Sequence, residues 1–143
     1  MSKAFPFTGS AIRIANCKSD WTLHGEKCYF LVDQSHSWTD SLKHCQSLNS
    51  TLASIHDEPT NTFLVNFAQF GLKFWSGGYK VGDDFYWIDQ SPFGPYTNWR
   101  DGQPDNANAN EDKIEVFRDA FDRQWNDAPD DARNVAICQY DAL

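Results

Sequence analysis

The sequence lacks several features that mark large functional classes. It has no apolar run near the 18 residues that cross a bilayer, so we expect no membrane insertion. Only 12 lysines and arginines face 20 aspartates and glutamates, and the net charge of −8 argues against nucleic acid as a partner. It also lacks a Ser-His-Asp arrangement, an HExxH motif and a glycine-rich phosphate loop. These absences favour a binding protein over an enzyme.

Cysteine is sparse, and its four copies fit neither a CxxC motif nor a zinc-site spacing: Cys17, Cys28, Cys45 and Cys138. An even number in a chain with 15% aromatic residues favours two disulfides, which form in an oxidising compartment. The sequon Asn49-Ser50-Thr51 fits the same compartment. We therefore expect a secreted, extracellular protein, although residues 1–16 lack the apolar stretch of a signal peptide.

The length of 143 residues predicts one domain, over residues 17–143, preceded by a tail or leading strand over residues 1–16. Residues 21–32 favour a hairpin that turns at His24-Gly25-Glu26, and this hairpin can bring Cys17 and Cys28 within disulfide distance. A first helix begins after Ser37, with Trp38, Leu42 and Cys45 on one face.

A short strand over residues 52–55 precedes a second helix, which Asp57 caps and Gly71 ends. Its inward residues are expected to be Phe63, Leu64 and Phe67. After Gly71 we expect an irregular region of some forty residues, and then closing strands at 114–117 and 135–140. The predicted class is α+β, with two helices packed on small antiparallel sheets. A long irregular stretch in a compact domain is usually functional.

Residues 98–112 are rich in hard ligands, because nine of the fifteen carry a side-chain oxygen and none is His or Cys. This composition excludes a soft-metal site and suits calcium, which takes six to eight oxygens, better than magnesium. Gln103, Asp105 and Glu111 could supply three groups, and Asn126 and Asp127 could add more if strand pairing returns them to the loop. The alternative is an ordinary polar loop full of Asx-turns.

Taken together, the motifs resemble those of the C-type lectin-like domain family over residues 17–140. The matching pieces follow one another in order: Cys17, Trp21, Gly25, Cys28-Tyr29, Trp38, Cys45, Leu52-Ala53-Ser54-Ile55, Trp75-Ser76-Gly77-Gly78, Trp87-Ile88-Asp89, Asn98-Trp99, Gln103-Pro104-Asp105, Glu111-Asp112, Trp125-Asn126-Asp127 and Cys138. Each piece is weak alone, whereas a dozen in order are specific. The resemblance implies the disulfides 17–28, typical of the family's long form, and 45–138. It also implies that Trp75, Trp87, Trp99 and Trp125 belong to the core.

The resemblance further implies a calcium ion held by Gln103, Asp105, Glu111, Asn126 and Asp127, with a cis Gln103–Pro104 bond. Two vicinal sugar hydroxyls would complete the calcium shell and contact Gln103, Asp105, Glu111 and Asn126. In the family a Gln-Pro-Asp triplet goes with galactose or N-acetylgalactosamine. The expected function is therefore calcium-dependent binding of glycans, with homo-oligomers supplying avidity. The alternative is a lectin-like domain that binds a protein or another surface, with calcium structural or absent.

Two further expectations concern departures from the family pattern, and a third concerns a second calcium site. The aromatic ring that usually follows the triplet is missing, and Tyr96 or Phe93 is the substitute that the chain offers. Lys113 and Asp130 stand where the family usually has a cysteine pair, and we hypothesise an ion pair between them. An auxiliary calcium site is a further possibility in such domains, built here from Asp83 or Asp84 with Asn106 and Glu111.

Overall fold

The computed structural model describes residues 15–69, 71–119 and 122–143. Most of the segment 1–16, predicted to be a tail or leading strand, lies outside these residues. Asn16 is within them, and its backbone pairs with that of Leu143 through hydrogen bonds of 3.0 and 3.2 Å. The two ends of the described chain therefore lie side by side at Asn16 and Leu143.

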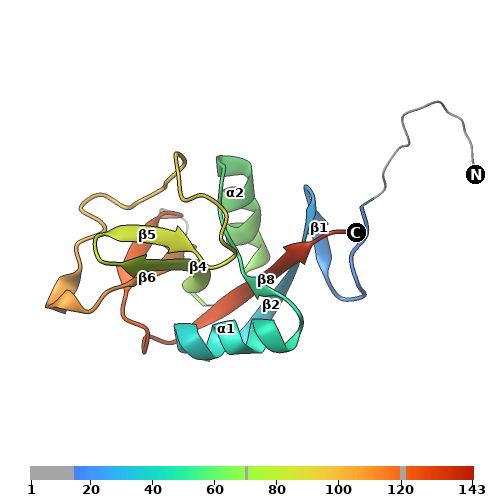
Figure 1. Cartoon of the computed structure of the whole chain (residues 1–143), viewed down its shortest axis with the longest axis horizontal. Coiled ribbons are helices and arrows are strands. Elements are labelled where there is room, and N and C mark those ends of the chain that lie inside the picture. Colours follow the sequence, from blue (N-terminus) through green and yellow to red (C-terminus); the bar gives the residue numbers. More distant parts are fainter. Residues whose placement is uncertain (1–14, 70, 120–121) are drawn as a thin grey trace, which may run out of the picture.

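The predicted α+β class is confirmed, and the strands, expected to form small antiparallel sheets, join in one mixed sheet (Figure 1). Its order is β1 (Thr22–His24), β2 (Lys27–His36), β8 (Asn134–Asp141), β4 (Lys73–Val81), β6 (Lys113–Phe117) and β7 (Trp125–Ala128). Two more strands lie off this path: β3 (Thr51–Leu52) pairs with β8, and β5 (Asp84–Trp87) pairs with β4. The β4–β8 pair is parallel and the other pairs are antiparallel.

Both predicted helices are present, and each begins at its predicted cap. Helix α1 (Trp38–Ser47) follows Ser37, whose hydroxyl accepts the Asp40 N–H at 3.1 Å. Helix α2 (Glu58–Phe67) follows Asp57, whose carboxylate accepts the Thr60 N–H at 2.8 Å. The helix ends before the predicted Gly71. Its inward face contains the predicted residues, because Leu64 is buried and the half-buried Phe63 and Phe67 pack against the same core cluster; Val65 is buried as well.

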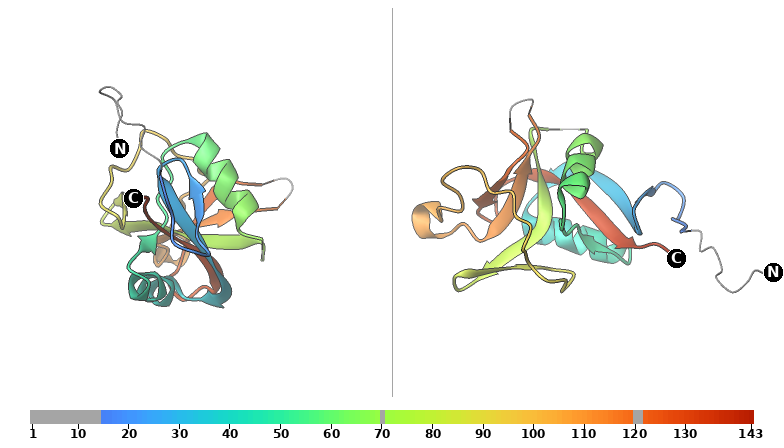
Figure 2. Two further views of the ribbon diagram at one scale, coloured as in Figure 1. Left: turned by 90° about the vertical axis from the view of Figure 1, so that its right-hand side faces the viewer. Right: turned by 90° about the horizontal axis from the view of Figure 1, so that it is seen from above.

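The two helices cover opposite faces of the central strands (Figure 2). Along β8, Ala136 and Cys138 belong to a core cluster that contains Trp38 of α1, while Ile137 belongs to the cluster that contains Leu64 of α2. Adjacent strand residues point to opposite faces, and because both faces are covered, β8 is apolar without interruption from Val135 to Cys138. Trp75, Trp87 and Trp125 are fully buried, and Trp99 packs against the core cluster that contains Trp87 and Trp125, as expected for core residues.

The structure contains both disulfides that the family resemblance implies. Cys17–Cys28 joins the segment before β1 to β2, with a Cα–Cα distance of 5.6 Å. Cys45–Cys138 joins α1 to β8, with a Cα–Cα distance of 5.4 Å. The second bond ties the first helix to the last strand across most of the chain.

The prediction of forty irregular residues is wrong in its extent, because β4 and β5 form a hairpin and only residues 88–112 are largely irregular. Gly77 and Gly78 of β4 are packing residues. A Cβ on Gly78 would lie 2.3 Å from Ile114 Cδ1, and one on Gly77 would lie 2.8 Å from the Leu52 carbonyl oxygen. The predicted strand 52–55 is also shorter, since β3 ends at Leu52.

Candidate calcium and sugar site

The oxygen-rich loop is attached along β7, where the Trp-Asn-Asp motif begins. Trp125 donates its N–H to the Asn98 carbonyl at 2.8 Å, and its own carbonyl accepts the Arg100 N–H at 2.9 Å. This pairing lays the start of the loop beside the strand. The rest of the loop, around the short 3₁₀ turn η1 (Ala107–Ala109), projects from the end of the molecule opposite the C-terminus (Figure 1).

Asp127 of β7 is the buried anchor of this loop. Its carboxylate is fully buried and accepts the backbone N–H groups of Asp105 at 3.2 Å and Asn106 at 2.8 Å. A buried carboxylate is costly unless it is hydrogen-bonded or paired, and these two bonds supply part of that compensation. The same bonds bring Asp105 against the strand.

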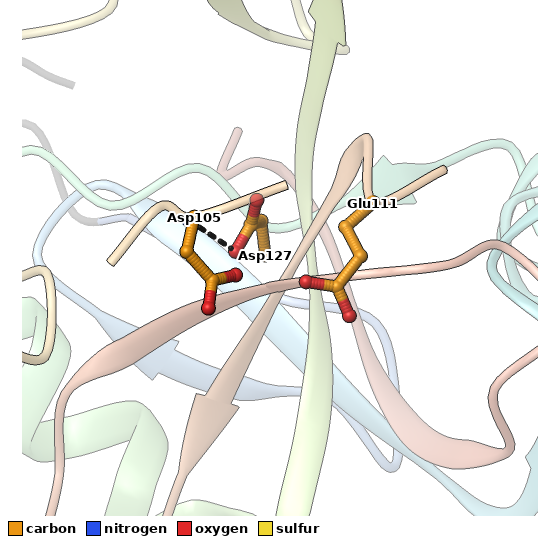
Figure 3. Close-up of side chains that lie close together, drawn as sticks. All are labelled: Asp105, Glu111 and Asp127. Carbon is orange, nitrogen blue, oxygen red and sulfur yellow. Dashed lines mark hydrogen bonds between the residues drawn. The ribbon is translucent and has the colours of Figure 1, made fainter. Parts of the chain in front are cut away.

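Three carboxylates converge at this point (Figure 3). One oxygen from each of Asp105, Glu111 and Asp127 lies within 4.8 Å of the other two, and this is the single His, Cys, Asp or Glu group of metal-binding geometry within residues 15–69, 71–119 and 122–143. Like charges this close repel one another, so the arrangement favours a cation among them. Oxygen donors of this kind suit calcium.

A tight turn holds Glu111 in place. The Ala107 N–H donates to Glu111 Oε1 at 3.1 Å, and the Glu111 N–H donates to Asn106 Oδ1 at 3.1 Å. Asn106 and Asn108 take positive φ angles of 49° and 59°, which asparagine tolerates better than most residues. The run of asparagines therefore shapes the turn that returns Glu111 to Asp105.

The electrostatics of the site agree with this geometry. Burial raises the pKa of Glu111 above its usual value, and the neighbouring carboxylates of Asp127 and Asp105 raise it further. A bound cation reverses this effect by stabilising the ionised carboxylates. The site as built thus holds negative charge that a cation would neutralise.

Gln103 adds a neutral oxygen donor. Its Nε2 donates to Asp105 Oδ2 at 3.5 Å, while its Oε1 is buried and has no hydrogen-bond partner. A buried oxygen without a partner costs free energy that a bound cation would recover. The peptide bond between Gln103 and Pro104 is cis, as the resemblance implies.

Asn126 directly precedes Asp127 on β7, and its hydrogen-bond partner is a residue that our sequence reasoning missed. It is half-buried on β7 and donates from Nδ2 to Glu115 Oε2 at 2.8 Å. Glu115 is buried in β6, directly opposite Asn126 in the strand pairing. The available signal was a lone glutamate between Ile114 and Val116, at a position that strand alternation assigns to the opposite face.

The hypothesised ion pair is present. Lys113 Nζ lies 3.8 Å from Asp130 Oδ2 and 3.0 Å from Asp112 Oδ1, and it also sits 5.0 Å from the centre of the Trp38 ring. Asp130 accepts the hydroxyl of Thr39 at 2.5 Å. This contact therefore links the base of the loop region to α1.

Two other expectations find no support. The hollow beside Asn106 and Glu111 has a volume of about 260 Å³, and its lining includes Lys80 and Asp112 but neither Asp83 nor Asp84. The rings proposed as sugar-stacking substitutes pack inward. Phe93 and Tyr96 lie 6.2 and 5.8 Å from the Trp125 ring, measured between ring centres.

Comparison with known proteins gives consistent matches. Residues 34–140 match the lectin C-type domain model. The perlucin-like protein of Mytilus galloprovincialis is 32% identical over 126 residues, which cover 84% of this chain and 80% of that protein. The chain spans less than two thirds of several other curated relatives. No helix among the described residues is long and apolar enough to cross a membrane.

Two solved structures superpose closely on this chain. A calcium-independent type II antifreeze protein has a TM-score of 0.82 and 26% identity, covering 92% of this chain and 98% of its own. The C-type lectin domain of murine dendritic cell inhibitory receptor 2, solved in complex with an N-glycan, has a TM-score of 0.81 and 26% identity, covering 88% and 99%. The same architecture thus occurs with a glycan ligand and in a protein described as calcium-independent.

Proposed function

The chain belongs to the C-type lectin domain family, and from that premise we propose that it is a calcium-dependent lectin for terminal galactose-type sugars. The observation that carries this proposal is the convergence of Asp105, Glu111 and Asp127 beside the unpartnered oxygen of Gln103. Carboxylate and amide oxygens in an irregular loop are the donor set that calcium prefers. The proposed role is recognition without catalysis.

In this proposal the ion is held by Gln103, Asp105, Glu111, Asn126 and Asp127. When bound, calcium supplies open coordination positions for two vicinal sugar hydroxyls. The chain's own groups orient those hydroxyls. The Gln103 amide can both donate and accept, whereas the Asp105 carboxylate only accepts. This order of amide and carboxylate sets the direction of the hydrogen bonds around the hydroxyl pair, and we assign it to galactose or N-acetylgalactosamine.

The exposed position of the loop implies weak binding at a single site. Asp105 and Asn106 are exposed, and residues 106–110 include no aromatic ring to cover the sugar's apolar face. A few hydroxyl contacts bury little area, so we propose that useful avidity comes from homo-oligomers or clustered glycans. The two disulfides and the exposed sequon residue Asn49 support an extracellular location.

A second candidate function is binding of a protein or another surface, with calcium structural or absent. The likeness to a calcium-independent antifreeze protein favours it, because the same fold there is described as working without calcium. The inward packing of Phe93 and Tyr96 favours it too, since both rings pack against Trp125.

Retention on immobilised galactose tests the proposal. The native chain is expected to bind in calcium and to elute with EDTA. Asp105→Ala should abolish retention, because it removes a carboxylate that faces both the ion and the sugar. Asp101→Ala is the matched control, an exposed aspartate of the same loop, and should bind as the native chain does. Calcium-dependent retention of Asp105→Ala would overturn the assignment of the site.

A further inference from the structure

Glu115 is a buried carboxylate whose partners are all donors. Only 2% of its surface is exposed. Its Oε2 accepts the Nδ2 of Asn126 at 2.8 Å, and its Oε1 accepts the Nδ2 of Asn134 at 3.0 Å. Lys73 Nζ completes the set at 3.3 Å from Oε1. The three partners come from β7, β8 and β4, so Glu115 in β6 sits at the centre of a cross-strand polar group.

We propose that Glu115 is a positioning residue that fixes the side-chain amide of Asn126, so that its carbonyl oxygen is left for the calcium ion. This inference rests on the proposed function, because it concerns one of the ligands assigned there. It adds a residue that touches neither the ion nor the sugar. Glu115 acts through the direction in which Asn126 Oδ1 points.

The reason lies in the two faces of an amide. An asparagine side chain can turn over and exchange its oxygen and nitrogen with little change in shape. A carboxylate paired with an ammonium group only accepts hydrogen bonds, so the amide nitrogen must face Glu115. The reverse orientation would place two oxygens against each other and leave a buried acceptor unpaired. Glu115 therefore selects the orientation in which Asn126 Oδ1 points away from it.

A cation site needs that selection. Calcium is bound through oxygen, and an amide nitrogen cannot replace the donor. Groups that orient metal ligands from behind typically change metal affinity about 10- to 100-fold when they are removed. Lys73 offsets the charge of Glu115 from the partly exposed side of the sheet, with 36% of its side chain exposed. The carboxylate can thus remain buried next to a site that is already acidic.

The test is calcium affinity, measured by calorimetry on the full chain. In Glu115→Gln the new amide offers one oxygen and one nitrogen to two asparagines, so it no longer selects the orientation of Asn126. We expect calcium affinity to fall about 10- to 100-fold. Glu26→Gln, an exposed glutamate on the β1–β2 turn, is the control and should leave it unchanged.

A second substitution should rescue the first. When Glu115→Gln is combined with Asn134→Asp, the new carboxylate at position 134 accepts from the new amide nitrogen at position 115. The amide oxygen at position 115 is then left to accept from Asn126 again, and the net charge of the group equals that of the native chain. We expect calcium affinity to return to within about threefold of native, that is, within about 0.7 kcal/mol. A merely structural role would change the melting temperature in EDTA without this pattern in affinity.

The outcomes separate the two proposals. Native affinity in a folded Glu115→Gln chain would overturn the role of Glu115 while leaving calcium binding intact. An absence of calcium binding by the native chain would overturn the proposed function, and this inference with it. If Glu115→Gln does not fold, NMR of the native chain decides. Contacts from the Asn126 amide protons to the Glu115 side chain should persist when calcium is added, and their loss would overturn the proposal.

Discussion

Single residues at the candidate site combine anchoring of the loop with a proposed role as calcium ligands. Asp127 holds the loop through two backbone N–H groups and also faces Asp105 and Glu111. Burial and the neighbouring carboxylates disfavour the ionised form of Glu111 and so raise its pKa. The folded chain therefore binds the Glu111 proton more tightly than the unfolded chain does. Ionisation of Glu111 therefore lowers the stability of the fold as the pH rises above about 4.3, the ordinary pKa of a glutamate.

Glu111→Gln should therefore have opposite effects with and without calcium. In EDTA near neutral pH the neutral side chain removes the repulsion, so the melting temperature should rise, and the difference should shrink as the pH is lowered toward 4. In calcium the variant should lose the stabilisation that the ion gives to the native chain. Thermal melts at several pH values measure both effects. A variant that keeps the full calcium shift would exclude Glu111 as a ligand.

At this scale the sequence reveals the proposed ligands better than the residues that support them. Gln103, Asp105 and Glu111 are predictable because they lie in one polar loop with a recognisable spacing. Glu115 is not, because its alternation with Ile114 and Val116 does not reveal that both faces of β6 are covered. That burial depends on neighbouring strands far away in the chain.

The elements around the site depend on close packing of β4 against β6. Gly78 lies against Ile114, whose Cδ1, Cγ1 and Cβ would all lie within 3 Å of an added Cβ. Ile114 is adjacent to both Lys113 and Glu115 and faces Asp127 in the strand pairing. A bulkier residue at position 78 would thus push on β6 and, through it, on β7, the strand that carries Asp127.

Gly78→Ala should destabilise the fold by about 1–3 kcal/mol, the usual cost of overpacking a core. Adding Ile114→Val removes the closest clashing atom and should restore part of that loss. Urea unfolding of the two single variants and the double variant measures the coupling. Strictly additive losses would show that the contact between these positions does not limit the packing.

Element boundaries that depend on nearby residues were predictable from the sequence, whereas those that depend on distant residues were not. Both helices were predictable from their caps, because Ser37 and Asp57 act on the N–H three residues later. The β4–β5 hairpin was not, because Gly77 and Gly78 resemble breakers until the neighbours they make room for are known. The predicted α2 was too long, because Gly71 was expected to end the helix. Gly71 does have a positive φ of 73°, but the helix already ends at Phe67.

For the whole molecule, the two disulfides constrain loops of very different length. Cys45–Cys138 spans 93 residues and Cys17–Cys28 spans 11. In the chain-entropy account the long loop contributes about 4–5 kcal/mol and the short one about 3 kcal/mol. The long bond also crosses the core beneath α1, where both cysteines are fully buried.

Replacing Cys45 and Cys138 together with alanine should therefore cost more stability than replacing Cys17 and Cys28. The loss of packing adds to the entropic difference, because removing two buried sulfur atoms leaves space in the core. Urea unfolding in EDTA gives the comparison without any contribution from calcium. A larger loss from the Cys17 and Cys28 pair would contradict this ranking.

The central claim is that calcium and then a galactose-type sugar bind the folded chain. Thermal melts in EDTA, in millimolar calcium, and in calcium with galactose or mannose test it most directly. A ligand that binds only the folded state adds RT ln(1 + [L]/Kd) to its stability. We predict a higher midpoint in calcium and a further rise with galactose that exceeds the rise with mannose. A midpoint that calcium leaves unchanged would contradict the account.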